Sequence, residues 1–426
     1  MVTVTGPSMK RVSLASFVGT AIEYYDFYIY GTAAALVFPT VFFPQMSPTM
    51  ATIASFATFA VAFFSRPVGA AVFGHFGDRL GRKKTLIATL LIMGLSTTAV
   101  GLVPGADTIG VAAPLSLLAL RLLQGFAVGG EWAGAALLSA EYAPARRRGA
   151  YGMFTQLGVG SGLLLSSLVF LTVNLTVGEK SPAFIEWGWR LPFLFSAVLI
   201  AVALYVRLSL DETPVFRREI AAGSVSPVPI ADLLRHQGSQ TLLGAGSMTG
   251  IFTFSFMAGT YFLGYAGTTL KHPRNLILTV AVLGALSMLV LTAASALLSD
   301  RYGRRAVILV GFGLALPWCF AVVPLLDTGS HALFALAIMG TFGILGLSYG
   351  PMASFIPEVF ETRFRYTGSG LAFNLGGILG GAMPPLVAGA LLARYGSWAI
   401  GAMMAALILL SLLATYALPE TKAKAL

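Results

Sequence analysis

Gly74-His-Phe-Gly-Asp-Arg-Leu-Gly-Arg-Lys-Lys-Thr85 and Leu298-Ser-Asp-Arg-Tyr-Gly-Arg-Arg305 are two copies of one short charged motif. Five positions of the motif recur 222 residues later. Asp78, Arg79, Gly81, Arg82 and Lys83 correspond to Asp300, Arg301, Gly303, Arg304 and Arg305. Each copy lies between two long apolar runs. A repeat at about half the length of a chain indicates two homologous halves, each with its own copy of the motif.

The composition is that of an integral membrane protein. Of the 426 residues, 57% are hydrophobic and 10% are charged, whereas about 25% of the residues of a soluble domain are charged. In so apolar a chain, two parallel repeats are typical of a transporter built from two lobes. The single cysteine, Cys319, lies within an apolar run and has no partner with which to form an intramolecular disulfide.

Twelve apolar runs are long enough to cross a bilayer, which takes about 20 residues. We predict spans at 13–38, 50–73, 85–103, 112–138, 149–173, 190–209, 240–266, 275–298, 306–326, 331–352, 366–393 and 397–418. The expected fold is therefore an all-α polytopic membrane protein of twelve transmembrane helices in two six-helix lobes. The lobes cover 1–210 and 239–426, and the proline-containing segment 211–238 links them on the cytoplasmic side.

Lys and Arg residues are distributed unequally over the two sets of loops. Of the 27, 20 lie on one side, five lie on the other, and Arg66 and Arg121 lie within spans. Because cytoplasmic loops carry the excess of positive charge, we expect a multi-pass protein of the cell membrane with both termini in the cytoplasm. The same clusters account for the net charge of +10 without a nucleic-acid partner.

Five separate motifs stand out along the chain. They are Glu23-Tyr-Tyr-Asp-Phe-Tyr-Ile-Tyr-Gly31, Ser65-Arg-Pro-Val-Gly69, Gly74-His-Phe-Gly-Asp-Arg79, Arg121-Leu-Leu-Gln-Gly-Phe-Ala-Val-Gly-Gly-Glu131 and Asp211-Glu-Thr-Pro214. With the twelve spans, they resemble the major facilitator superfamily over essentially the whole chain, and within it the metabolite:proton symporter family.

The resemblance implies a secondary active transporter. Members of this family import carboxylates such as shikimate, 2-oxoglutarate or citrate by proton symport, and one branch imports proline and betaine. A carboxylate is thus the expected substrate, and a zwitterionic osmolyte is the alternative. Export of drugs by antiport fits less well, because 149–173 lacks the proline that such exporters carry in their fifth helix.

Five ionisable side chains lie well inside predicted spans, all in the first half: Glu23, Asp26, Arg66, Arg121 and Glu131. A charge at the centre of a membrane helix costs about 2.5–3.5 kcal/mol on insertion scales, so a functional role is the first hypothesis. Glu23 and Asp26 are three residues apart and share one helix face. We predict Asp26, Glu23 and Glu131 as candidate proton-coupling residues. For Glu131, the first expectation is a structural pair with Arg66, and an internal proton relay is the alternative.

The resemblance gives Asp26 and Arg121 a joint role. In proton-coupled sugar porters of the superfamily, a first-helix aspartate faces a fourth-helix arginine, and these two residues occupy the matching positions. A nearby arginine favours the ionised carboxylate, and an arriving anion competes for that arginine. Proton binding and anion binding would therefore promote each other. The alternative is a structural ion pair between the two helices.

Arginine is suited to bidentate recognition of carboxylates, so Arg121 and Arg66 are candidate substrate-binding residues. The neutral polar candidates for the same cavity are Tyr24, Gln156, Tyr261, Tyr265 and Asn374. For each tyrosine, the alternative is helix packing or a place in the aromatic belt at the membrane surface.

The repeated motif is, at its simplest, positive charge on the cytoplasmic side. The resemblance adds a cytoplasmic gate, in which Asp78 accepts hydrogen bonds from the end of another helix and Asp300 does the same for the second half. The gate residues are Asp78, Arg79, Gly81, Arg82, Asp300, Arg301 and Arg304. We also expect Glu358 to form a charge network with Arg363 and Arg365.

No sequence signature of an enzyme is present. The chain has no Gly-x-x-x-x-Gly-Lys-Ser/Thr phosphate loop and no His-Glu-x-x-His motif. We therefore expect no catalytic residue, no cofactor and no metal site. The expected partners are a small-molecule substrate, protons and the lipid bilayer, and we expect the protein to be a monomer.

Overall fold

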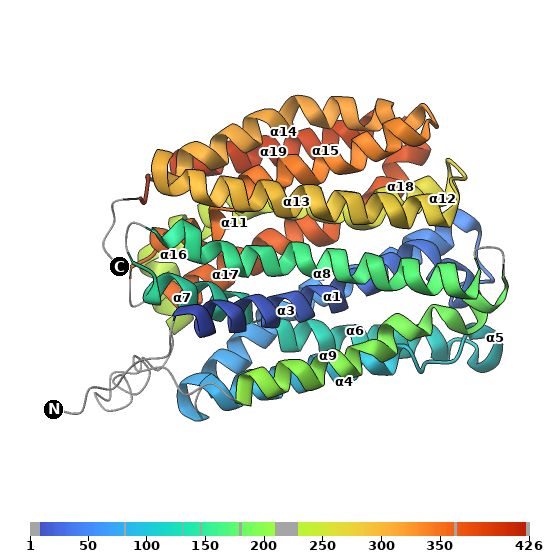
Figure 1. Cartoon of the computed structure of the whole chain (residues 1–426), viewed down its shortest axis with the longest axis horizontal. Helices are drawn as coiled ribbons and strands as arrows, with labels where there is room; N and C mark the ends of the chain where they lie inside the picture. The colour runs from blue at the N-terminus through green and yellow to red at the C-terminus, as the bar shows by residue number, and fades with distance from the viewer. Residues whose placement is uncertain are drawn as a thin grey trace.

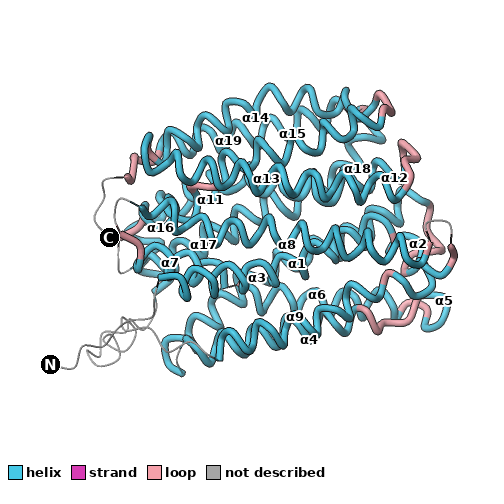
Figure 2. The backbone as a smooth tube through the Cα atoms, in the orientation of Figure 1, coloured by secondary structure: helices cyan, strands magenta, loops and turns pink. Residues whose placement is uncertain are grey.

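The computed structural model describes residues 9–80, 82–129, 131–144, 147–178, 181–208, 229–361 and 364–422. These residues form helices joined by short loops, and none of them is in a strand (Figure 2). The helices of the first half are α1 (Met9–Leu36), α2 (Phe38–Val41), α3 (Pro48–Leu80), α4 (Arg82–Val100), α5 (Ala106–Ile109), α6 (Ala112–Val128), α7 (Glu131–Tyr142), α8 (Arg148–Val177), η2 (Phe184–Gly188) and α9 (Arg190–Leu208).

The second half repeats this pattern of long helices. Its helices are α11 (Pro229–Phe256), η3 (Met257–Tyr261), α12 (Phe262–Thr268), α13 (Arg274–Tyr302), α14 (Arg304–Asp327), α15 (His331–Tyr349), α16 (Met352–Val359), α17 (Arg365–Gly377), η5 (Ile378–Ala382), α18 (Met383–Tyr395) and α19 (Trp398–Ala417). The segments named η are single π-helical turns, and each lies next to an α-helix or between two.

Consecutive helices combine into twelve columns that match the twelve predicted spans. Ten of these columns are long and apolar enough to cross a membrane. The other two are α1, which carries Glu23 and Asp26, and α4, whose apolar part is the shorter stretch Ile87–Val100. The predicted all-α fold of twelve transmembrane helices is therefore confirmed.

The two halves of the chain form two neighbouring bundles. In Figure 1, helices α1 to α9 occupy the lower part of the view, and helices α13 to α15, α18 and α19 occupy the upper part. Across the interface, α8 packs along α13, α1 packs against η3 and α12, α3 packs against α17, η5 and α18, and α7 and α8 pack against α16. Functional groups at this interface can thus come from both halves.

Glycines bring α3 and α6 into backbone contact. A Cβ atom on Gly125 would lie 2.1 Å from the carbonyl oxygen of Ala62, and one on Gly69 would lie 1.8 Å from that of Phe126. Membrane helices commonly approach one another closely where small residues meet. This contact places Arg66 and Arg121 on two tightly packed helices.

One end of the bundle is rich in arginine, and we call it the basic end. It is the end at which α8 and α14 begin, and it carries Arg147, Arg148, Arg301, Arg304 and Arg305. The first residues of α11 belong to the predicted linker 211–238, and the non-helical backbone of Gln237 lies close to its expected boundary. Residues 211–228 of that linker lie outside the described residues.

Candidate functional site

Two hydroxyl groups hold the Asp26 carboxylate inside the first bundle. The hydroxyl of Thr97 on α4 donates to Oδ2 at 2.8 Å, and the hydroxyl of Ser196 on α9 donates to Oδ1 at 2.7 Å. Only 2% of Asp26 is exposed. The carboxylate of α1 is therefore bound from two neighbouring helices by neutral donors.

Arg121 is connected to Asp26 through two neutral side chains. Its Nη1 donates to Oε1 of Gln124 at 2.9 Å, and Nε2 of Gln124 donates to the Thr97 hydroxyl at 2.8 Å. Nε and Nη2 of Arg121 have no hydrogen-bond partner in the described part of the chain. The structure thus brings the two predicted residues into one network, but without the direct ion pair that the resemblance suggested.

Aromatic rings surround both buried arginines. The guanidinium carbon of Arg121 lies 4.2 Å from the ring centre of Tyr30 and 4.3 Å from that of Phe27. The guanidinium carbon of Arg66 lies 4.2 Å from the same Phe27 ring and 4.7 Å from that of Phe63. Such contacts stabilise a cation by about 0.5–2 kcal/mol each when water is excluded. Phe27 therefore links the two candidate substrate-binding arginines.

The expected pair between Arg66 and Glu131 is not observed. Arg66 is fully buried, and none of its three guanidinium nitrogens has a hydrogen-bond partner among the described residues. Its guanidinium group faces the rings of Phe27 and Phe63 instead. Glu131 is the first residue of α7 and is 4% exposed.

Glu23 and Tyr24 lie one turn before Asp26 on α1. Both are buried, and both are close enough to Arg66 to interact with its charge. Among the described residues, no group of three or more His, Cys, Asp or Glu side chains is arranged to hold a metal ion. Glu23 and Tyr24 therefore lie near Arg66, whereas Asp26 is connected to Arg121.

A small cavity lies where the two halves meet. Its volume is about 10 Å³, which is room for about one water molecule. The lining residues are Tyr24, Val159, Ile251, Phe252, Ser255, Met288, Leu345 and Tyr349. Of the predicted substrate-binding residues, Tyr24 is the one that lines it. The lining residues come from both halves of the chain.

Gln156 and Asn374 connect the two halves. Nε2 of Gln156 donates to the carbonyl oxygen of Tyr349 at 2.9 Å, and Nδ2 of Asn374 donates to that of Gly129 at 2.7 Å. Trp132 donates to Oε1 of Gln156 over 3.4 Å. Each of the two amides thus donates to a backbone carbonyl of the opposite half.

Tyr261 and Tyr265 lie away from this cavity. The hydroxyl of Tyr265 donates to Oδ1 of Asp327 at 2.6 Å, and the ring of Tyr261 packs between those of Tyr265 and Phe56. Tyr261 closes the π-helical turn Met257–Tyr261. Tyr265 lies in the last turn of α12, which ends at Thr268, so it is near the end of its span.

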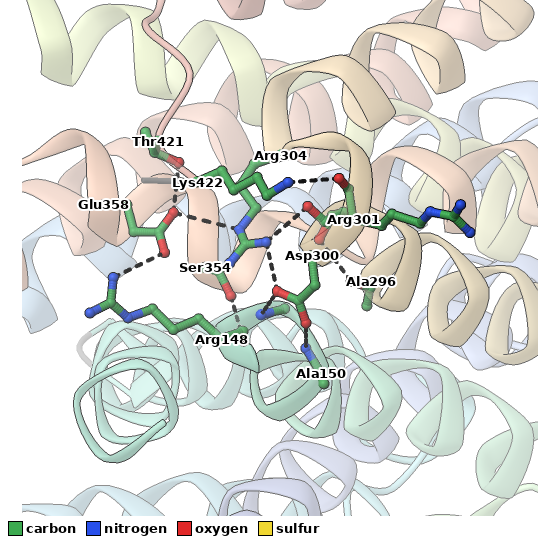
Figure 3. A network of polar contacts seen from close by, with 12 residues as sticks. Arg148, Ala150, Ala296, Asp300, Arg301, Arg304, Ser354, Glu358, Thr421 and Lys422 are labelled. Atoms are coloured by element: carbon green, nitrogen blue, oxygen red, sulfur yellow. Dashed lines mark hydrogen bonds and ion pairs between the residues drawn. The ribbon is translucent and has the colours of Figure 1, made fainter. Parts of the chain in front are cut away.

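Asp300 joins the two halves at the basic end. Its carboxylate accepts hydrogen bonds from the backbone N–H groups of Gly149 and Ala150, both at 2.9 Å, in the first turn of α8 (Figure 3). It also accepts one from Nη1 of Arg304 at 2.7 Å. A carboxylate at a helix N-terminus is stabilised by the helix dipole. The predicted contact between Asp300 and the end of another helix is therefore present.

Glu358 forms the second part of this network. Its oxygens lie 3.8 Å from Nη1 of Arg148 and 3.7 Å from Nε of Arg304, and Oε2 accepts a hydrogen bond of 2.6 Å from the Thr421 hydroxyl (Figure 3). Among the described residues, Glu358 thus pairs with Arg148 and Arg304 in place of the expected Arg365. Nε of Arg365 donates to a backbone carbonyl, and Arg363 lies outside the described residues.

The glycine of the second motif has a clear structural reason. Gly303 has φ of +107°, and a Cβ atom there would lie 2.6 Å from Oε2 of Glu420. This tight turn lets Glu420 accept hydrogen bonds from the backbone N–H groups of Arg304 and Arg305. The backbone carbonyl of Arg301 accepts one from Lys422. The side chains of Asp78, Arg79 and Arg82, and the whole of Gly81, lie outside the described part.

The halves also meet at the end opposite to the basic end. Nη1 of Arg274 donates to Oδ1 of Asn174 at 3.0 Å, and Nδ2 of Asn174 donates to Oδ1 of Asn275 at 2.5 Å. Asn174 belongs to α8, whereas Arg274 and Asn275 begin α13. Polar contacts thus join the halves at both ends of the bundle, with the small cavity between them.

Several residues of the site were missed by the sequence analysis. Gln124 is a neutral polar side chain inside a predicted span, as Gln156 is, and could have been selected for the same reason. Thr97 and Ser196 give no such signal, because a hydroxyl in a helix can bond to its own backbone. Phe27 is one of 30 phenylalanines, and nothing in the sequence distinguishes it.

Known proteins resemble this chain in sequence and in fold. A sequence model described as Major Facilitator Superfamily matches residues 16–384. The inner membrane metabolite transport protein YhjE of Escherichia coli (strain K12) is 43% identical over 98% of this chain and 96% of its own length. The shikimate transporter of the same strain is 40% identical, over 91% and 89%. Its proline/betaine transporter is 33% identical, over 89% and 77%.

Solved structures agree on the fold. The crystal structure of a D-xylose-proton symporter superposes with a TM-score of 0.76 and 20% sequence identity, covering 99% of this chain and all of that one. The relatives are transporters, which confirms that the chain is a multi-pass membrane transporter and not an enzyme. The chain belongs to the Major Facilitator Superfamily, among its metabolite transporters.

Proposed function

We propose that this protein imports a small organic anion, a carboxylate metabolite such as shikimate, 2-oxoglutarate or citrate, together with protons. The observation that carries the proposal is the state of Arg121. Its guanidinium group is fully buried and hydrogen-bonded to the neutral amide of Gln124, while Nε and Nη2 have no hydrogen-bond partner in the described part of the chain. These two donors are available to an anion.

The electrostatics of the first bundle support an anionic substrate. A charged group inside a membrane protein is costly unless it is paired, and Arg66 is also fully buried. A carboxylate that reaches these arginines would bring the compensating negative charge, and the planar guanidinium can bind it through two parallel hydrogen bonds. A neutral sugar would bring no such compensation.

Asp26 is the proton-coupling residue in this proposal. It is buried, and the Arg121–Gln124–Thr97 chain connects it to the cationic site. A proton on Asp26 removes the negative charge nearest to that chain and leaves Arg121 with a stronger attraction for the substrate anion. Binding of the proton and of the anion then favour each other, which is the requirement for symport. Glu23 and Glu131 are the further candidates.

Alternating access would expose the site to one side of the membrane at a time. In this proposal the lobes 1–210 and 239–426 rock about the central cavity while the linker 211–238 connects them. The contacts of Asp300 and of Asn174 would open in turn at the two ends. The basic end, with both termini, would face the cytoplasm, as the distribution of Lys and Arg predicts. We propose a monomer as the working unit.

A zwitterionic osmolyte such as proline or betaine is the second candidate. The aromatic side chains of Tyr24, Phe252 and Tyr349 line the cavity, and aromatic faces bind ammonium groups. Arg121 would then bind the carboxylate of the zwitterion. Both candidate substrates would use the same cationic site. The zwitterion would in addition place its ammonium group against the aromatic side chains that line the cavity.

Uptake into proteoliposomes tests the proposal. Labelled shikimate, 2-oxoglutarate and citrate would be compared with proline and betaine, each with and without an inward proton gradient. We expect a carboxylate to accumulate only with the gradient, and Arg121→Lys to abolish this accumulation while Arg394→Lys, at the exposed end of α18, leaves it intact. Accumulation of proline or betaine alone would favour the second candidate, and accumulation without a gradient would refute proton symport.

A further inference from the structure

The hydroxyl of Thr97 lies at the centre of three polar contacts. Its oxygen is 2.8 Å from Oδ2 of Asp26, 2.8 Å from Nε2 of Gln124 and 3.0 Å from the backbone carbonyl oxygen of Met93. Thr97 is fully buried, so these groups make up its polar surroundings. The hydroxyl has one proton to donate and two lone pairs to accept with, and two of the three neighbours compete for that proton.

Gln124 fixes one of the two lone pairs. Its Oε1 accepts from Nη1 of Arg121, so its Nε2 must point toward Thr97. Reversing the amide would bring its N–H groups against those of the guanidinium group, which has no acceptor. Thr97 therefore always accepts from Gln124, and it meets Asp26 with one lone pair and one rotatable proton.

Two arrangements satisfy every group in this cluster. When Asp26 is ionised, the Thr97 hydroxyl donates to Oδ2. When a proton from the aqueous side binds Oδ2, the new O–H donates to Thr97, and the Thr97 hydroxyl turns to donate to the carbonyl oxygen of Met93. Ser196 donates to Oδ1 in both arrangements, which directs the proton to Oδ2. The exchange needs a rotation of one hydroxyl and no movement of heavier atoms.

We propose that Thr97 is the positioning residue for protonation of Asp26, because its hydroxyl changes from donor to acceptor as the carboxyl group gains a proton. The inference rests on the proposed proton symport and adds a residue to it. The charged groups that face Asp26 from other helices are Arg121 on α6 and Glu131 on α7, and Tyr25 flanks it on α1. At Asp26, α4 and α9 contribute the hydroxyls of Thr97 and Ser196.

The neighbouring residue offers a matched control. Thr98 is also on α4, and its hydroxyl donates to the backbone carbonyl of Gly94 at 2.9 Å. Thr97→Val removes the hydroxyl and keeps the shape of the side chain, Thr97→Ser keeps the hydroxyl, and Thr98→Val makes the same chemical change one position away. Proton-driven accumulation and substrate counterflow, which needs no net proton transfer, would be measured for each from pH 5 to 9.

We expect Thr97→Val to lower accumulation at least about tenfold and to move the midpoint of its pH profile upward by about one unit. Both forms of Asp26 lose a hydrogen bond, and the bond lost by the ionised carboxylate is the stronger of the two. Counterflow should stay within about twofold, which also shows that the variant is folded. Thr97→Ser and Thr98→Val should resemble the parent protein. If Thr97→Val does not fold, Thr97→Ala carries the same expectation.

The outcomes separate this inference from the proposed function. If the parent protein accumulates substrate with the gradient, Asp26→Asn does not, and Thr97→Val has the parent pH profile, the role of Thr97 is refuted and proton symport stands. A parent protein that shows no dependence on the gradient refutes the proposed function itself. Loss of counterflow together with accumulation in a folded Thr97→Val protein would also contradict the inference, because it indicates a role in substrate binding.

Discussion

Arg121 and Asp26 are connected through Gln124 and Thr97, so the buried cation and the buried carboxylate interact without touching. A direct ion pair would have to break before the arginine could bind an anion, and breaking a buried pair is costly. In the observed arrangement Arg121 keeps two donors available, at Nε and Nη2, in the described part of the chain. The carboxylate can therefore influence anion binding without occupying the anion's position.

Phe27 should matter for substrate affinity, because its ring contacts the guanidinium groups of both Arg66 and Arg121. We expect Phe27→Leu to raise the KM for uptake by about two- to thirtyfold, as the loss of contacts worth about 0.5–2 kcal/mol implies. Phe320→Leu is the control, since that side chain is 59% exposed on α14. Equal KM values for both variants and the parent protein would exclude this role.

Asp300→Ala should open the basic end. The substitution removes the acceptor for two backbone N–H groups of α8 and for Arg304, and hydrogen bonds to charged groups are worth about 1.5–3 kcal/mol each. Ser255→Cys, at the cavity, in a protein with Cys319→Ala, would report the change. We expect faster labelling by an impermeant maleimide from the basic side. Asp107→Ala, on the exposed helix α5, should leave the rate unchanged.

Asn174→Ala should have the opposite effect. It removes the contacts of α8 with Arg274 and Asn275 at the other end of the bundle. With the same Ser255→Cys reporter, labelling should become faster from the side opposite to the basic end and slower from the basic side. Faster labelling of Asn174→Ala from the basic side would contradict the proposal that the contacts of Asp300 and of Asn174 close opposite ends of the bundle.

The contact between α3 and α6 should not tolerate a side chain at Gly125. Because a Cβ atom would lie 2.1 Å from the backbone oxygen of Ala62, Gly125→Ala must push the helices apart, and overpacking of this kind costs about 1–3 kcal/mol. Gly313→Ala is the control, since no atom lies within 4 Å of its Cβ position on α14. Thermal unfolding should show a lower Tm for Gly125→Ala and an equal or higher Tm for Gly313→Ala.

The fold could be predicted from the sequence because each span must satisfy its own backbone hydrogen bonds in the bilayer and therefore forms one long apolar helix. The charged site residues could be predicted for a related reason, since Asp26, Arg66 and Arg121 interrupt apolar runs. All three are buried in the structure. The sequence alone thus identifies which charged side chains lie inside the membrane-spanning helices.

The partners of those charges could not be predicted in the same way. Arg66 lies against aromatic rings and not beside Glu131, because the direction of a long side chain depends on packing that the spacing of residues does not reveal. The hydroxyl of Ser196 is indistinguishable in the sequence from one that bonds to its own helix. Tyr265 lies away from the cavity in the last turn of α12, where its hydroxyl donates to Asp327.

The most direct test of the account is to compare accumulation with counterflow in Asp26→Asn. Asparagine keeps the shape of the side chain and cannot carry the proton. The account predicts that proteoliposomes with Asp26→Asn lose gradient-driven accumulation of the anion and keep counterflow within about twofold of the parent protein, because the substrate site is intact. Gradient-driven accumulation at the parent level by Asp26→Asn would contradict the assignment of Asp26 as the proton-coupling residue.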